Sequence, residues 1–151
     1  MCYNLTMYSQ DRQELKDFIH ALALQAPEIE AIYFFGSRVN KNRPSEKSDI
    51  DIAFLFDKTF YGNYPLKAFF ACQMIGAEIS EYYAKPVDVS LLNNASLCFT
   101  YEVITTGLCL YEKDHTGRIL YEIAVKGQFF DFKPFLVQLR EKKLKTLSSI
   151  A

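Results

Sequence analysis

The sequence is short of several features that mark particular classes of protein. It contains no tryptophan, and its four cysteines stand far apart, without the paired spacing of a zinc site and without a secretory segment ahead of them. No apolar run approaches the roughly 18 residues that a membrane-spanning helix needs. These absences argue against a disulfide-stabilised, zinc-binding or membrane-spanning protein. We therefore expect a cytoplasmic protein with reduced thiols and no membrane partner.

An excess of charge of one sign is also missing. Lysine and arginine number 17 and aspartate and glutamate 18, which gives a formal net charge of −1. Proteins that bind nucleic acids usually show a basic excess or a basic face, so we expect no direct nucleic-acid partner. A basic stretch near the end of the chain is interpreted as an exposed helix face; it comprises Lys133, Arg140, Lys142, Lys143 and Lys145.

Apolar and aromatic residues, in contrast, are abundant. Half of the 151 residues are hydrophobic, and 13 phenylalanines and 10 tyrosines make up the 15% that are aromatic. Such a chain buries a core, and its length suits a single domain. No repeat or linker divides it, so we predict one domain over residues 1–151, with a core over about 11–112 and a helical extension over about 113–148. The aromatic content also suits a surface that binds a partner.

Hydrophobic periodicity divides the chain into helices and strands. Apolar residues at helical intervals predict helices over about 11–25, 65–83, 96–106, 115–130 and 134–148. Alternating or continuously apolar runs predict strands over 31–35, 49–56 and 87–92, with an edge strand over 108–111. The order of these elements predicts an α/β or α+β fold, in which a small mixed sheet is flanked by helices and C-terminal helices follow.

A glycine and a serine come directly after the first predicted strand. This strand ends at Phe35, and Gly36 and Ser37 follow it. Glycine allows the backbone to approach a bound group closely, and the free amides at the start of a helix attract anions. A strand that runs into such a pair predicts a turn that holds phosphate.

Three aspartates add a second feature to this turn. Asp49 and Asp51 open the second predicted strand, and side chains two residues apart on a strand point the same way. Asp88 lies on the third predicted strand. Neighbouring carboxylates repel each other unless a cation lies between them. The three acids and the turn after Phe35 therefore predict a site for Mg²⁺ and the phosphates that it carries.

This combination resembles the signature of the DNA polymerase β-like nucleotidyltransferase superfamily. The similarity lies in Phe34-Phe35-Gly36-Ser37-Arg38, in Ser48-Asp49-Ile50-Asp51, and in Pro86-Val87-Asp88-Val89. The eleven residues between Ser37 and Asp49 make this gap slightly longer than its commonest form, which predicts a loop insertion. The small size and these motifs look like the minimal, MNT-type branch of the superfamily. The layout matches over about 11–112, and the motif is specific mainly over 33–55.

The resemblance implies a nucleotidyltransferase fold and a role for each acid. Asp49 and Asp51 match the residues that hold the metal ions in the superfamily, and Asp88 matches the acid that shares a metal and helps to deprotonate the attacking hydroxyl. Mg²⁺ is the implied cofactor.

The resemblance also implies how the nucleotide is held. Gly36 and Ser37 would hold the β- and γ-phosphates of ATP, and Arg38 lies close enough in sequence to add positive charge. The implied reaction is in-line attack on the α-phosphorus with release of pyrophosphate.

The acceptor has to be inferred from context, because the motif defines the chemistry better than the substrate. The resemblance favours an antitoxin paired with a HEPN-domain ribonuclease toxin, to which it transfers AMP on a tyrosine hydroxyl and with which it forms a hetero-oligomer. Two alternatives stay open. One is an antitoxin that neutralises its toxin by binding alone, and the other is an enzyme that modifies a small molecule of the aminoglycoside type.

Overall fold

A four-stranded mixed sheet lies in the middle of the molecule. The structure, a computed structural model, describes residues 9–36 and 49–150, with side chains from residue 13 onward. The strands are arranged in the order β3-β2-β1-β4. Their bounds are Ile29–Phe35 for β1, Ile50–Phe56 for β2, Val87–Leu91 for β3 and Leu108–Glu112 for β4. β1 is antiparallel to both β2 and β4, whereas β2 and β3 are parallel.

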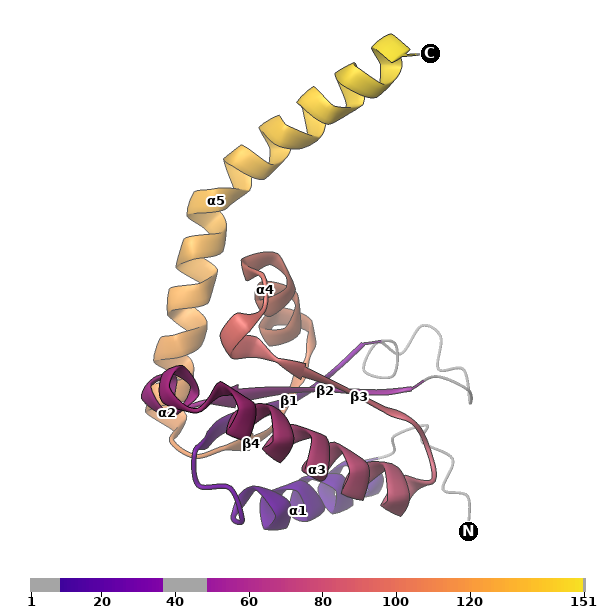
Figure 1. The fold of residues 1–151 in the computed structure, drawn as a ribbon, viewed down its shortest axis with the longest axis vertical. Coiled ribbons are helices and arrows are strands. Elements are labelled where there is room, and N and C mark those ends of the chain that lie inside the picture. Colours follow the sequence, from indigo (N-terminus) through magenta and orange to yellow (C-terminus); the bar gives the residue numbers. More distant parts are fainter. Residues whose placement is uncertain (1–8, 37–48, 151) are drawn as a thin grey trace.

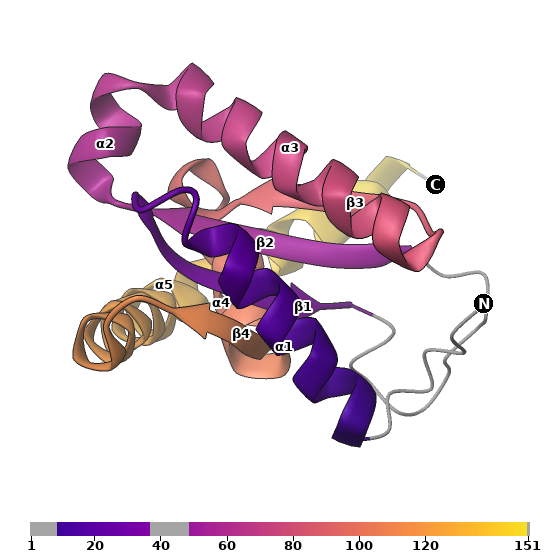
Figure 2. The ribbon, with the colours of Figure 1, turned by 90° about the horizontal axis from the view of Figure 1, so that it is seen from below.

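Helices cover both faces of this sheet. They are α1 (Ser9–Ala23), α2 (Lys58–Asn63), α3 (Pro65–Tyr83), α4 (Leu97–Thr106) and α5 (His115–Ile150), with a short 3-10 helix over Leu92–Asn94. Figures 1 and 2 show α1 and α3 on one face of the sheet, and α4 with the first part of α5 on the other. The mixed α/β architecture predicted from the sequence is therefore confirmed.

Alternation along the strands builds two cores, one on each face. In β2, Ile50, Ile52 and Phe54 are buried in the cluster with α1 and α3, whereas Ala53 and Leu55 are buried in the cluster with α4 and α5. Side chains alternate between the faces of a strand, so a strand with apolar residues at successive positions has to be covered on both sides. The same alternation decides which face the acidic residues of this strand occupy.

Several predicted boundaries agree closely with the structure. The helix predicted over 65–83 is α3, which has Pro65 in its first turn and ends before Ala84, a residue in the left-handed conformation with φ 50°. The predicted strands match β1, β2, β3 and β4 within two residues at each end. α2 was not predicted, because its six residues are too few to show a period. Asp57 caps this helix by accepting a hydrogen bond from the Phe60 amide at 2.8 Å.

The prediction of two helices at the end of the chain, over 115–130 and 134–148, was wrong. The structure has a single helix of 36 residues, α5, with Pro134 inside it. Proline lacks an N–H and crowds the preceding turn, which suggested a break, but its φ angle is compatible with a helix. Figure 1 shows α5 changing direction about halfway along its length, and proline is a common cause of such bends. None of the helices in the described part of the chain combines the length and apolarity needed to cross a membrane.

Candidate functional site

The glycine after β1 lies directly against an aspartate of β2. Phe35, the last residue of β1, pairs with Asp51. Gly36 has a φ angle of +87°, in the left-handed region that favours glycine. A Cβ atom added to Gly36 would lie 2.3 Å from Oδ2 of Asp51. The carboxylate therefore occupies the space that any larger residue at position 36 would need.

The third predicted acid lies beside Asp51. Asp51 pairs with Asp88 in the parallel register of β2 and β3. Residues opposite each other on neighbouring strands point to the same face. Because Ile50 and Ile52 face α1 and α3, Asp51 and Asp88 lie on the face that α4 covers. Asp51 is half-buried and Asp88 is exposed.

Asp49 is placed at the same end of the sheet. It is exposed and directly precedes β2, which begins at Ile50, one residue later than predicted. The Ile50 amide donates a hydrogen bond to the Pro86 carbonyl at 2.9 Å, which joins the start of β2 to the segment that leads into β3. The structure thus brings Gly36 and the three acids to one end of the sheet, whereas Ser37 and Arg38 lie outside the described residues.

The donor chemistry of these acids fits a magnesium ion that arrives with a nucleotide. Within residues 9–36 and 49–150, no group of three or more histidines, cysteines and acids is arranged to hold a metal ion by itself. Mg²⁺ is usually bound by one or two carboxylates together with phosphate oxygens and water, and not by an all-protein cage. Asp51 and Asp88, adjacent in register on one face, supply such a pair.

Replacing Gly36 with alanine is expected to lower the rate of any reaction that depends on the Asp51 carboxylate by about a hundredfold, the size of effect that misplacement of a reacting group by about 1 Å produces. The added methyl group would push against the Asp51 carboxylate, and alanine is also strained at a φ angle of +87°. The rate should be measured beside that of Gly127→Ala, since a Cβ atom at Gly127 meets nothing within 4 Å. Equal rates for wild type and both variants would contradict this placement of Asp51.

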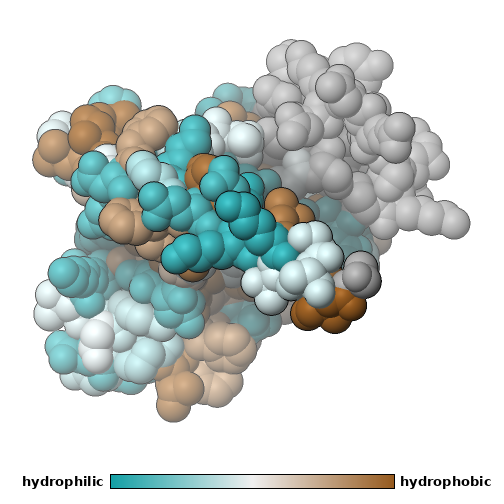
Figure 3. Space-filling view, turned by 90° about the horizontal axis from the view of Figure 1, so that it is seen from above, coloured by the Kyte–Doolittle hydropathy of each residue, from teal (hydrophilic) through white to brown (hydrophobic). Residues whose placement is uncertain are grey.

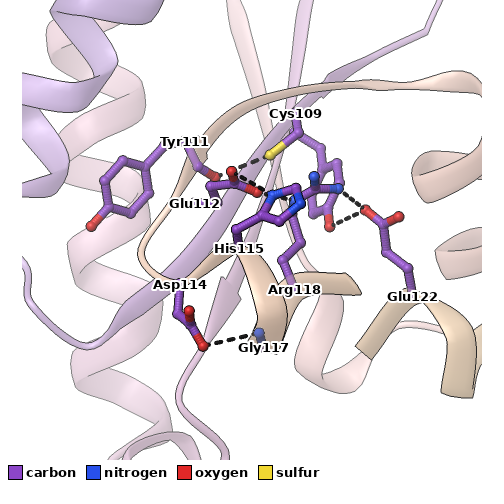
Figure 4. Close-up of polar contacts among 9 residues, drawn as sticks. Cys109, Tyr111, Glu112, Asp114, His115, Gly117, Arg118 and Glu122 are labelled. Atoms are coloured by element: carbon purple, nitrogen blue, oxygen red, sulfur yellow. Dashed lines mark hydrogen bonds and ion pairs between the residues drawn. The ribbon is translucent and has the colours of Figure 1, made fainter. Parts of the chain in front are cut away.

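A buried polar network lies on the same face of the sheet, where α5 crosses it (Figure 4). Nη1 of Arg118 donates to Oε1 of Glu122 at 2.5 Å, and the Tyr33 hydroxyl donates to the same oxygen at 2.9 Å. Nε of Arg118 donates to Glu112, which also contacts Nδ1 of His115. No local pattern in the sequence predicts this network, because a glutamate and an arginine four residues apart on a helix look like a surface pair.

The network shifts the pKa values of its members. Burial, reinforced by the hydrogen bond to Glu122, raises the pKa of Tyr33 far above its ordinary value, so this tyrosine stays neutral. Burial alone would lower the pKa of Arg118, but hydrogen bonds to Glu112 and Glu122 raise it, and the guanidinium remains charged. The network joins β1, β4 and α5, so it holds the long helix against the sheet.

Acid is expected to weaken the fold through Glu112. The hydrogen bond from Arg118, followed by that from His115, lowers the pKa of Glu112 below 4.5. A lowered pKa in the folded state stabilises the protein above the unfolded value, and this contribution is lost as the pH falls through the folded pKa. Urea unfolding between pH 7 and about pH 3 should show a smaller loss for Glu112→Gln than for wild type. Identical losses would show that other carboxylates account for the acid sensitivity.

Comparisons with known proteins relate the chain to a family and to solved structures with a similar fold. The model of the family described as polymerase beta, nucleotidyltransferase, matches residues 17–116. Among curated proteins, none matches the chain significantly.

Solved structures of toxin–antitoxin pairs share the fold. A mutant MntA–HpeT pair contains a chain that is 19% identical, with 85% of this chain and 98% of that chain covered and a TM-score of 0.65. A tri-AMPylated HEPN toxin from Shewanella oneidensis in complex with an MNT antitoxin gives 20% identity, coverage of 88% and 98%, and a TM-score of 0.63. A toxin–antitoxin structure with AMP-PNP gives 20% identity, coverage of 85% and 98%, and a TM-score of 0.65.

Proposed function

Because the chain belongs to the polymerase beta family of nucleotidyltransferases, we propose that it is an antitoxin that transfers AMP from ATP to a tyrosine hydroxyl of a HEPN-domain ribonuclease toxin. The observation that supports the transferase activity is the row formed by Gly36, which directly follows β1, Asp51 of β2 and Asp88 of β3. A turn with a close backbone approach beside two carboxylates suits a triphosphate and its cation.

The names of the similar solved structures support a HEPN toxin as the partner of this chain. They describe toxin–antitoxin pairs, one of which contains an AMPylated HEPN toxin bound to an MNT antitoxin. Another contains AMP-PNP. These structures are of other proteins, and they support a HEPN toxin as the acceptor and ATP as the nucleotide. The toxin and this chain would then form a hetero-oligomer.

The acids of this chain have distinct parts in the proposed reaction. Asp49 and Asp51 would hold Mg²⁺, which would neutralise charge on the triphosphate. Asp88 shares this site and accepts the proton of the attacking tyrosine hydroxyl. Gly36, Ser37 and Arg38 hold the β- and γ-phosphates, so that the triphosphate is oriented for in-line attack.

The proposed reaction is balanced in bonds and protons. The tyrosine oxygen forms a bond with the α-phosphorus of ATP, and the bond from that phosphorus to the oxygen bridging the α- and β-phosphates breaks. Pyrophosphate leaves, and the hydroxyl proton passes to Asp88 and then to water. The protein contributes positioning and charge and forms no covalent bond itself.

A mass measurement tests this function directly. The purified chain is incubated with ATP, Mg²⁺ and the product of the neighbouring gene, which the proposal expects to be a HEPN-domain protein, and the intact mass of that product is recorded. We expect an increase by one or more AMP units, located on a tyrosine by peptide mapping. An unmodified HEPN protein in the presence of a folded chain would contradict the proposal.

Two further outcomes separate the alternatives. Cells that produce the toxin should lose protection when the antitoxin carries Asp49→Asn and Asp51→Asn. Protection that persists in this variant would indicate neutralisation by binding alone. Resistance to an aminoglycoside on expression of the chain without any HEPN partner would instead indicate a small-molecule substrate.

A further inference from the structure

A notch opens where α5 leaves the body of the protein beside α4. Its walls include Tyr101 and Thr105 of α4 and Phe129, Leu136 and Val137 of α5, and its volume is about 370 Å³. Figure 1 shows α4 and α5 diverging here, with the second half of α5 projecting away from the sheet.

The side of α5 that packs on the body continues into this notch. Among the residues of α5, all of which are described, Glu122 and Val125 are the buried ones. Phe129 stacks on Tyr101 with 3.7 Å between the ring centroids. Leu136 lies seven residues after Phe129, and such a spacing returns to the same side of a helix. The intramolecular contact between α4 and α5 therefore ends in an apolar surface that nothing within the described chain covers.

On its sides that do not line the notch, α5 presents a mixture of apolar and polar residues. Phe130, Phe135 and Leu139 are 57%, 60% and 59% exposed. Figure 3, which looks onto the end from which α5 projects, shows hydrophilic and hydrophobic surface side by side along this helix. A helix that buries so little of its own apolar surface gains most of its stability from packing against something else.

The charges around the notch define what fits it. Residues 131–150 carry five basic and two acidic side chains, a net charge of +3, so the remainder of the chain, with a total of −1, carries −4. Lys133 and Arg140 line the notch together with one acid, Glu102. A second copy that paired its own projecting helix with this one would bring two segments of the same positive charge together, which is unfavourable. An acidic partner is attracted instead.

We propose that the notch between α4 and α5 binds an amphipathic α-helix of the toxin partner, with an apolar stripe in the notch and acidic residues against Lys133 and Arg140. The identity of this partner rests on the proposed function. An apolar helix stripe that enters a groove between two helices is a common mode of protein recognition. The acidic residues on its flanks set the orientation of the docked helix.

Docking at this position places the partner on the face of the sheet that holds the candidate acids. α4 covers that face, and Phe99 of α4 packs edge-on against Phe35, the residue before Gly36, with 5.4 Å between ring centroids. The helix that forms one wall of the notch therefore also contacts the strand end at the candidate site. A toxin held by the notch would contact α4 and would leave Asp51 and Asp88 unoccupied, since neither lines the notch.

Binding measured without ATP separates this proposal from catalysis. Two probes are titrated with the full chain: the same HEPN-domain protein as in the transfer assay, and a synthetic amphipathic helix with leucines at helical spacing and glutamates on its flanks. For Lys133→Glu with Arg140→Glu we expect the dissociation constants of both probes to rise by about tenfold or more. The matched control is Lys142→Glu with Lys145→Glu, which makes the same charge change on the opposite side of α5 and should bind within about twofold of wild type.

The outcomes distinguish docking from transfer. Asp51→Asn should bind both probes like wild type. Absence of AMP transfer by the wild-type chain, together with weaker probe binding by the Lys133→Glu, Arg140→Glu variant, would overturn the proposed function but support the docking site. Equal affinity of wild type and the Lys133→Glu, Arg140→Glu variant would overturn the docking site even where transfer occurs. A wild-type chain that binds neither probe would overturn it as well.

A cysteine in the notch gives an independent measurement. Cys98 is exposed and lines the notch, whereas burial raises the pKa of Cys72 and Cys109 to about 11 and keeps these thiols slow to react. In a Cys2→Ser background, the rate of maleimide modification at Cys98 is followed with and without the HEPN protein. Docking should slow this reaction severalfold, and an unchanged rate at saturating HEPN protein would contradict the placement.

Discussion

Replacing Asp51 with asparagine is expected to lower nucleotidyl transfer on the order of a thousandfold, the effect of removing one preorganised group that stabilises charge in a transition state. Asp51 lies between Gly36 and Asp88 in the row at the end of the sheet. Asparagine keeps the shape of the side chain but removes the charge that a cation requires. The measurement is the initial rate of AMP transfer to the HEPN protein at saturating ATP.

Asp57→Asn is the matched control for this variant. Asp57 follows the other end of the same strand and caps α2 through the Phe60 amide. Asparagine caps helices about as well as aspartate, so stability and transfer should both stay close to wild type. Comparable losses in the two variants would show that the effect of Asp51→Asn is not specific to the row. A normal rate for Asp51→Asn would remove Asp51 from the site.

Replacing Arg118 with methionine is expected to lower the free energy of unfolding by about 3 kcal/mol, the usual cost of breaking a buried ion pair by removing one partner. The side chains of Arg118 and Glu122 are 15% and 11% exposed, so the remaining carboxylate would be left with one hydrogen bond, from Tyr33, in a largely dry environment. Urea denaturation at neutral pH measures this change. The fold should remain, because α5 still packs through Val125 and Phe129.

Two further variants test whether the loss of stability in Arg118→Met comes from breaking a buried ion pair. Lys113→Met removes the pair between Lys113 and Glu30, whose side chains are 49% and 34% exposed and whose charged atoms are 3.8 Å apart. Such surface pairs contribute less than about 1 kcal/mol. Replacing Tyr33, Arg118 and Glu122 together with Phe, Met and Leu should recover much of the stability, because apolar residues of similar size commonly replace buried ion pairs well. If Lys113→Met lowered the free energy of unfolding as much as Arg118→Met does, burial of the ion pair would not be the cause of the loss.

The secondary structure could largely be predicted because its signals are local. Pro65 and the Pro86 that follows it bracket α3, and the apolar run that ends at Gly36 defines the end of β1. The short α2 and the long α5 are the exceptions. Pro134 suggested a break, but whether a helix continues through a proline depends on a compatible φ angle and on the small energy needed to bend, and residue type alone determines neither.

The sequence by itself determined the chemistry available to this protein: a glycine turn after a buried strand, and acids that begin or lie within later strands. Tertiary structure alone decided which of them become neighbours. The order β3-β2-β1-β4 and the register of β2 with β3 place Asp51 beside Asp88 and against Gly36. The tertiary structure also brings Tyr33 into hydrogen-bonding contact with Glu122, 89 residues later in the chain. Strand order and register depend on how both faces of the sheet are buried at once, and that is a property of the whole chain and not of any local segment.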